Sequence, residues 1–208
     1  MSADDAPPPG TRRSRAKAER RAELLSAAAS LMAKRGFAGV RLEDIGGAVG
    51  VSGPAMYRYF ASKSELLDEL LLDISRRLYT GGVEVVERGE PPAQTLTALI
   101  GFHIDMLVRR PDLISVQDRD MSSLTPAARH EVRRLQRCYV ERWVDVVMAL
   151  SAERDAVPVD RAEARVRVHA MFGLLNSSPR LPDFDADRLR ELLTAMAAAA
   201  LRAGASVE

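Results

Sequence analysis

The sequence predicts an all-α protein with a small N-terminal domain of three helices followed by a larger helical domain. Every long segment places apolar residues three and four positions apart, the spacing of one helix face, and no segment shows the strict alternation of a strand. Prolines and glycines separate these segments. With 208 residues, 47% of them hydrophobic, the chain is long enough to bury a real core.

Composition excludes several classes of protein. There is no apolar run of eighteen residues, so no membrane partner is expected. The N-terminus "MSADDAPPPG" carries two acids and lacks the apolar segment of a secretory signal, and we expect residues 1–10 to form a disordered tail. The single cysteine, Cys138, suits a reducing compartment and excludes an internal disulfide. These features predict a cytoplasmic protein.

Charge is unevenly distributed along the chain. Residues 11–63 hold eleven basic and four acidic side chains, a balance of +7, whereas the whole chain carries only +1. A basic N-terminal part on an acidic remainder favours an anionic partner for that part alone, most simply nucleic acid. A solvated charged helix is the alternative.

The N-terminal part contains three helical segments. Residues 15–34 have one apolar face and end at Gly36. Residues 40–50, "VRLEDIGGAVG", form a short helix whose glycines, Gly46 and Gly47, predict tight packing against a neighbouring helix. Ser52 is a good N-cap for a second short helix. Two short helices joined by a tight glycine-containing turn make a helix-turn-helix.

The second short helix combines two anchors with an unusual exposed face. Met56 and Phe60, four residues apart, are expected to hold it against the core. The remaining positions hold small residues, which permit close approach to a groove wall or phosphate, and tyrosine hydroxyls and an arginine, which can contact phosphates and bases. The next helix begins after Ser62, and Lys63 lies at its positive N-terminus, where an anion would be favoured. A surface helical hairpin is the alternative interpretation.

Residues 36–71, "GFAGVRLEDIGGAVGVSGPAMYRYFASKSELLDELL", closely resemble the DNA-binding segment of TetR-family transcriptional regulators. The resemblance rests on a glycine-aromatic pair, an acid-isoleucine pair, "GVS", then tyrosine, phenylalanine and "SK". It implies DNA contacts from the recognition helix and its flanks, made by Ser52, Gly53, Pro54, Ala55, Tyr57, Arg58, Tyr59 and Lys63. Arg41 stands where the family often has threonine, and we include it as a charged contact to phosphate. Tyr59 stands where histidine is common.

The resemblance also implies a division of the chain. Residues 11–62 correspond to the DNA-binding domain, and residues 63–208 to the effector-binding and dimerisation domain. Helices in the second part are predicted at 63–79, 92–109, 112–119, 126–151, 160–177 and 186–203. Gly81 and Gly82 are among the residues expected to separate them.

The last two helices carry the stripes that the family uses for pairing with a second copy. This implies a homodimer held by small and apolar residues: Val166, Ala170, Gly173, Leu189, Leu192, Leu193, Met196 and Ala200. The alternative is that both stripes only close the core of one chain, and periodicity does not distinguish the two.

A small-molecule effector is expected inside residues 92–178, the segment that the family uses as its pocket. Candidate apolar walls and polar contacts are Phe102, His103, Met106, Gln117, Arg119, Trp143, Met171, Phe172 and Asn176. Each of these residues can instead fill the core, and Asn176 can cap a helix end. The segment "FGLLNS" resembles regulators of lipid metabolism, which makes acyl chains or acyl-CoA thioesters the first candidates.

Motifs for other chemistry are absent from the sequence. His103, His130 and His169 lie too far apart for a short zinc motif, so no metal or cofactor is expected. No nucleophile elbow, phosphate loop or dinucleotide fingerprint occurs. The sequence therefore predicts a dimeric, ligand-responsive repressor on a double-stranded palindromic operator, and not an enzyme. The alternatives are an activator, an architectural DNA binder, or a small-molecule-binding protein or enzyme with a vestigial DNA-binding head.

Overall fold

The computed structural model describes residues 9–153, 158–178, 181 and 184–202, and all of its regular elements are helical, as predicted. The helices of the N-terminal part, the head, are α1 (Pro9–Arg35), α2 (Leu42–Ala48) and α3 (Gly53–Met56). Those of the body are α4 (Lys63–Glu87), α5 (Pro92–Arg109), α6 (Pro111–Asp120), a 3₁₀ turn (Met121–Ser123), α7 (Pro126–Ala152), α8 (Arg161–Asn176) and α9 (Ala186–Arg202).

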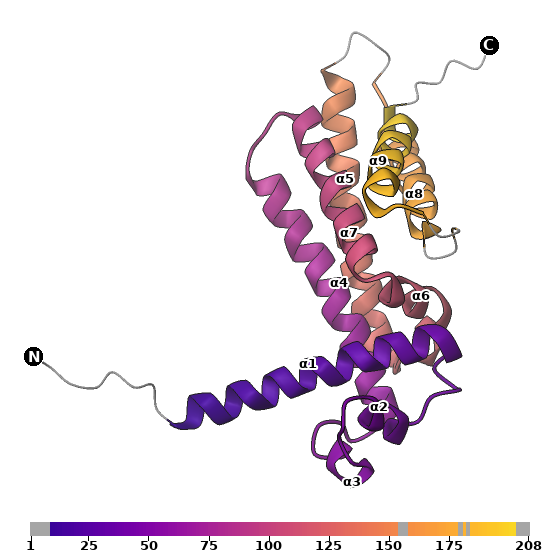
Figure 1. The fold of residues 1–208 in the computed structure, drawn as a ribbon. Helices are drawn as coiled ribbons and strands as arrows, with labels where there is room; N and C mark the ends of the chain where they lie inside the picture. Colours follow the sequence, from indigo (N-terminus) through magenta and orange to yellow (C-terminus); the bar gives the residue numbers. More distant parts are fainter. Residues whose placement is uncertain (1–8, 154–157, 179–180, 182–183, 203–208) are drawn as a thin grey trace, which may run out of the picture.

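The head and the body lie at opposite ends of an elongated molecule. Figure 1 shows α2 and α3 below α1, while α4 rises from this end alongside α5 and α7, and α8 and α9 lie at the far end. α6 packs on α1, whereas α9 packs on both α5 and α8. A continuous set of buried apolar side chains runs from the head into the body. α4 contributes to this set and packs on α1 of the head as well as on α5 and α7 of the body.

The first helix is longer than the sequence predicted. It begins at Pro9 rather than near residue 15, because proline is tolerated in the first helical turn. Residues 1–8 of the predicted tail lie outside the described residues. The exposed basic residues 12, 13, 15 and 17 lie in the N-terminal part of α1, which projects beyond the rest of the head (Figure 1).

The two glycines of α2 have different surroundings. A Cβ on Gly46 would meet the carbonyl oxygen of Val51 and the side chain of Met56, so the predicted close packing is confirmed there. It is wrong for Gly47, because nothing lies within 4 Å of an added Cβ. Gly50, at φ 71°, adopts the left-handed conformation that ends this helical segment before α3.

The expected break at Gly81 and Gly82 is wrong, because α4 continues through both to Glu87. A Cβ on Gly81 would overlap the ring of Phe102 in α5, and one on Gly82 would overlap the ring of Tyr139 in α7. The glycines therefore admit two aromatic rings to the surface of α4, and this packing outweighs their poor helix propensity. α4 ends instead before Gly89, which has φ 69°.

No helix in the described ranges is both long enough and apolar enough to cross a membrane. The other predicted helices of the body agree with the structure to within one residue at either end.

Candidate nucleic-acid interface and effector site

The predicted recognition helix is a single turn continued by hydrogen-bonded turns. Ser52 is its N-cap residue, and Pro54 lies in its first turn. After Met56 the backbone N–H of Arg58 donates to Ala55 O at 3.2 Å, and that of Tyr59 donates to Met56 O at 2.8 Å. Met56 and Phe60 are fully buried, which confirms them as the two anchors.

The anchors leave a defined set of side chains at the surface. Ser52, Pro54, Tyr57 and Arg58 are exposed, while Gly53, Ala55 and Tyr59 are half-buried. Tyr57 is 57% exposed, and its hydroxyl donates to Glu43 Oε1 of α2 at 3.3 Å. The hydrogen bond to the Glu43 carboxylate thus orients the Tyr57 ring, and the ring stays exposed to solvent.

Arg41 and Lys63 flank this surface in different ways. Arg41 is exposed at the N-cap of α2, where its backbone N–H donates to the carboxylate of Asp44 at 2.9 Å. The ammonium of Lys63 donates to Phe37 O and Val40 O, both at 2.7 Å, and lies 4.4 Å from the centre of the Phe37 ring. Lys63 therefore fastens the loop after α1 to the start of α4, whatever it contacts outside the chain.

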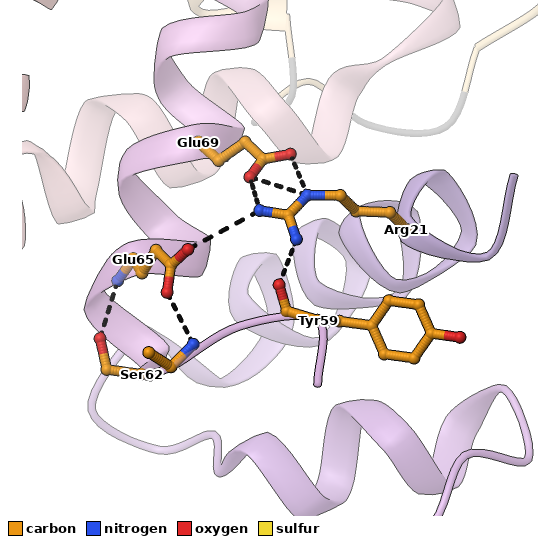
Figure 2. A network of polar contacts seen from close by, with 6 residues as sticks. Arg21, Tyr59, Ser62, Glu65 and Glu69 are labelled. Atoms are coloured by element: carbon orange, nitrogen blue, oxygen red, sulfur yellow. Dashed lines mark hydrogen bonds and ion pairs between the residues drawn. The ribbon is translucent and has the colours of Figure 1, made fainter. Parts of the chain in front are cut away.

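A second basic residue joins the head to α4. Figure 2 shows the guanidinium of Arg21 between α1 and α4: its Nε donates to Glu69 Oε1 at 2.7 Å, and it also donates to the carbonyl oxygen of Tyr59. Glu65 lies 3.8 Å from the same guanidinium and accepts a hydrogen bond from the N–H of Ala61. The end of the recognition segment, α1 and the first turns of α4 thus share one polar network.

Ser62 is the N-cap residue of α4, which begins at Lys63 as predicted. Its hydroxyl oxygen accepts a hydrogen bond from the N–H of Glu65 at 3.0 Å, which satisfies one of the free donors of the first turn.

The side chain of Arg119 is engaged with the end of α1, and its role as an effector contact stays a prediction. Its guanidinium donates to the carbonyl oxygens of Met32 and Ala33 at the end of α1, and it forms an ion pair with Asp120 at 3.2 Å. Free carbonyls at a helix C-terminus attract a cation, which explains the orientation. Arg119 connects α6 of the body to α1 of the head.

Three predicted effector residues meet in the interior of the body. The ring centres of His103 and Phe172 are 4.8 Å apart, those of Trp143 and Phe172 5.2 Å, and those of His103 and Trp143 6.1 Å. Tyr139 completes this aromatic cluster, with its hydroxyl 3.3 Å from His103 Nδ1. Tyr139 was not among the predicted effector residues, although its position four residues before Trp143 was a signal that both share one face of α7.

The aromatic cluster is uncharged at neutral pH. Burial lowers the pKa of His103 to about 4, and a polar contact with Asn176 opposes the shift. Burial also raises the pKa of the Tyr139 hydroxyl. His103 Nε2, Trp143 Nε1 and Gln117 Oε1 are buried without a hydrogen bond of normal geometry to any described residue. The interior thus offers neutral polar atoms within apolar walls.

The other predicted effector residues vary in burial. Met171 is fully buried, Phe102 and Met106 are half-buried, and Asn176 is exposed at the end of α8. Phe102 packs against Gly81. Their role as ligand contacts stays a prediction.

The predicted dimer residues divide into two groups. Val166 is 68% exposed on α8, and Leu192 and Met196 are 49% and 44% exposed on α9. Exposed or half-buried positions also hold Ala170, Gly173, Leu189 and Ala200. Leu193 is only 3% exposed because it faces the core of its own chain, so we remove it from the predicted contact surface.

Two family models match the chain. The one described as bacterial regulatory proteins of the tetR family matches residues 24–70, which include α2, α3 and both anchors. The one described as a tetracyclin repressor-like C-terminal domain matches residues 89–180. The chain belongs to the TetR family.

Relatives and solved structures agree with this assignment. The HTH-type transcriptional repressor KstR2 of Rhodococcus jostii is 29% identical over 144 residues, covering 69% of this chain and 70% of the relative. The structure of KstR2 from Mycobacterium tuberculosis has a TM-score of 0.74 at 21% identity, covering 86% of this chain and 92% of that one. The structure of AibR has a TM-score of 0.71 at 17% identity, covering 85% and 97%. The two structures share the fold of this TetR-family regulator.

Groups of three or more potential metal-binding side chains do not occur among the residues that the structure describes.

Proposed function

We propose that this TetR-family protein is a repressor that binds a palindromic operator as a homodimer and releases it when a mostly apolar effector enters the body. One observation carries the proposal. Tyr57 and Arg58 are exposed beside two buried anchors, Met56 and Phe60. This segment comes just before α4, the helix that runs into the body. Residues 11–62 would act as the DNA-binding domain and residues 63–208 as the effector and dimerisation domain.

The charges of the head support contact with DNA. The exposed basic residues 12, 13, 15 and 17 on α1, together with Arg41 and Arg58, can neutralise phosphates on both sides of the recognition helix. Ser52, Gly53, Pro54 and Ala55 would approach the major groove with little steric hindrance. Lys63 would add a phosphate contact through a donor that its two carbonyl partners leave free.

A two-fold dimer would place two recognition helices on successive major grooves. Such half-sites lie roughly 34 Å apart on the DNA. Val166 on α8 and Leu192 and Met196 on α9 are exposed apolar side chains. Both helices lie at the end of the molecule farthest from the head (Figure 1). Burial of these side chains against a second copy would remove them from water.

The interior favours the uncharged part of an effector. His103 is neutral at pH 7, and a carboxylate placed against the aromatic cluster would find no cation among His103, Tyr139, Trp143 and Phe172. An acyl chain, with its thioester available for hydrogen bonds, fits this environment. AibR was solved in complex with isovaleryl coenzyme A and operator DNA, which supports acyl-CoA thioesters as the first class to test.

Release of DNA requires an effector that prefers one conformation. A ligand that binds both conformations equally shifts nothing. The ring of Tyr139 packs on Gly82 of α4, and α4 carries Glu69, the partner of Arg21. Displacing the aromatic cluster would therefore move α4 and the polar network of Figure 2, and would change the spacing of the two heads.

Selection of bound fragments from a random duplex pool tests the DNA proposal. We expect a palindromic sequence, with Arg58→Ala weakening binding about tenfold or more and Arg134→Ala, on the body, leaving it unchanged. Equal affinity for the selected and random DNA at moderate salt would refute specific binding. Adding acyl-CoA thioesters of increasing chain length to the complex then tests release, and a tightly bound thioester that leaves operator affinity unchanged would refute the coupling.

Transcription from the selected promoter separates a repressor from an activator. Deletion of the gene should raise transcription from that promoter, whereas a fall would identify an activator.

A further inference from the structure

A groove of about 780 Å³ runs along the outer face of α7 between Tyr79 of α4 and His169 of α8. It lies apart from the aromatic cluster, because Tyr139 and Trp143 point from α7 into the core, whereas Arg137 and Arg142 are exposed. Its volume is in the range of small-molecule sites. Neither the DNA contacts nor the effector described above uses it.

Charge along the groove is unbalanced. Its two carboxylates are already paired: Glu141 with Arg161 and Arg165, and Asp145 with Arg161, at 2.6–2.7 Å. Three further guanidiniums line the groove, those of Arg133, Arg137 and Arg142. All three are exposed and have no ion pair with any residue that the structure describes.

Part of the lining of the groove is suited to a ring or another apolar group. Tyr79 and Val140 are half-buried and line the groove together with the half-buried Cys138. Guanidiniums bind phosphate oxygens in a two-pronged manner and also stack on flat rings. Apolar lining residues together with three guanidiniums that form no ion pair with the described residues therefore match a ligand with both a phosphate and an apolar part.

We propose that this groove binds an organic phosphate ester whose aromatic or apolar part lies on Tyr79 and Val140 while its phosphates contact Arg133, Arg137 and Arg142. The site is separate from the interior effector site and does not depend on it. Free nucleotides and the nucleotide end of coenzyme A thioesters share this chemistry. Tyr79 belongs to α4, so occupancy of the groove bears on the helix that leads to the head.

Cys138 provides a direct measure of occupancy, since it is the only cysteine in the sequence and it lines the groove. We expect ADP or acetyl-CoA to slow alkylation of Cys138 by a maleimide several-fold in the full-length protein. Adenosine, which lacks the phosphates, should not slow it. Protection by acetyl-CoA at lower concentration than by ADP would identify the coenzyme as the source, and the reverse order a free nucleotide.

Arg137→Gln and Arg134→Gln form a matched pair of variants. Arg137 lines the groove, whereas Arg134, one turn earlier on α7, is not among the lining residues. Arg134 is instead paired with Glu131 at 2.7 Å. Titration calorimetry with the better of the two ligands should show about tenfold or greater loss of affinity for Arg137→Gln and unchanged affinity for Arg134→Gln. Ligand affinity should also fall with rising salt.

Three results would overturn the proposal. The first is that neither ADP nor acetyl-CoA protects Cys138 or gives heat on titration. The second is equal loss of affinity in the two variants. The third is that Arg137→Gln separates a dimer into monomers in sedimentation, because the groove would then be a contact between copies. DNA binding is not the readout in any of these, so failure here is distinguishable from failure of the repressor proposal.

Discussion

Arg21 of α1 and Glu69 of α4 form a two-pronged ion pair, in which the Arg21 Nε donates to Glu69 Oε1 at 2.7 Å and the Arg21 Nη2 donates to Glu69 Oε2. The same guanidinium donates to the carbonyl oxygen of Tyr59 and lies 4.1 Å from the centre of the Phe60 ring. One side chain therefore fixes the end of the recognition segment to the helix that leads into the body.

Removing the charge of Glu69 should loosen the head. Both partners are about a third exposed, so we expect Glu69→Gln to cost about 1 kcal/mol of unfolding free energy in urea. Operator affinity should fall about tenfold, because Tyr59 loses its fixed donor. Glu23→Gln is the control. Glu23 pairs with Arg20 and is more exposed than Glu69, so this change should leave both the unfolding free energy and the operator affinity nearly unchanged. Equal effects of the two variants would contradict the structural role of Glu69.

Gly82 is required for the packing of α4 on α7. Gly82→Ala should lower the unfolding free energy by about 1–3 kcal/mol, because the new methyl group overlaps the ring of Tyr139. The matched change Gly101→Ala lies in α5 with nothing within 4 Å of the new Cβ, and should raise stability by up to about 1 kcal/mol through helix propensity. Urea unfolding measures both. A stabilising Gly82→Ala would show that the two helices are not packed in this way.

His103 should make stability depend on pH. Its folded pKa of about 4 lies below the value of about 6.5 expected in the unfolded chain, so the unfolded state takes up the proton first as pH falls. The contribution of His103 to the free energy of unfolding is therefore fully present above pH 7 and is lost as the pH falls from about 6.5 to 4. By pH 5 the loss is about 2 kcal/mol.

Variants isolate this contribution from that of the carboxylates. His103→Phe should remove most of the change in urea midpoint between pH 7.5 and pH 5, whereas His130→Gln, at an exposed position, should preserve it. An identical pH dependence in His103→Phe and the unmodified protein would mean that His103 is not buried in its neutral form.

Met196 tests the proposed surface for dimerisation. Because this side chain is 44% exposed in one chain, Met196→Arg should fold normally but place an unpaired charge in the interface, at a cost of several kcal/mol to association, roughly 3–5. Sedimentation should show a monomer, and operator binding should be lost. Leu193→Ala is the contrasting change, since Leu193 is buried in its own chain and its truncation should lower unfolding free energy by about 2–5 kcal/mol. A dimer that survives Met196→Arg would place the contact elsewhere.

Local signals in the sequence were sufficient for most of the fold. Helix spacing, proline positions and capping residues predicted α5 over the residues that the structure shows, and the bounds of α7 and α9 to within one residue. The four-residue spacing of Met56 and Phe60 predicted the anchors of the recognition helix. The apolar face of a helix can be recognised from the spacing of apolar residues in the local sequence, without knowledge of its distant packing partners. The family motif likewise lies within one continuous segment.

Contacts between distant segments decided the rest. Gly81 and Gly82 predicted a break by their propensity alone, and only the rings brought to them from α5 and α7 show why α4 continues. Arg119 belongs to a body helix, yet it binds carbonyls of α1 more than eighty residues earlier in the sequence. Leu193 and Met196 lie on the same predicted stripe, but one faces the core and the other the surface. Periodicity determines which side of a helix is apolar, whereas the direction in which that side points is set by packing against helices far away in the chain.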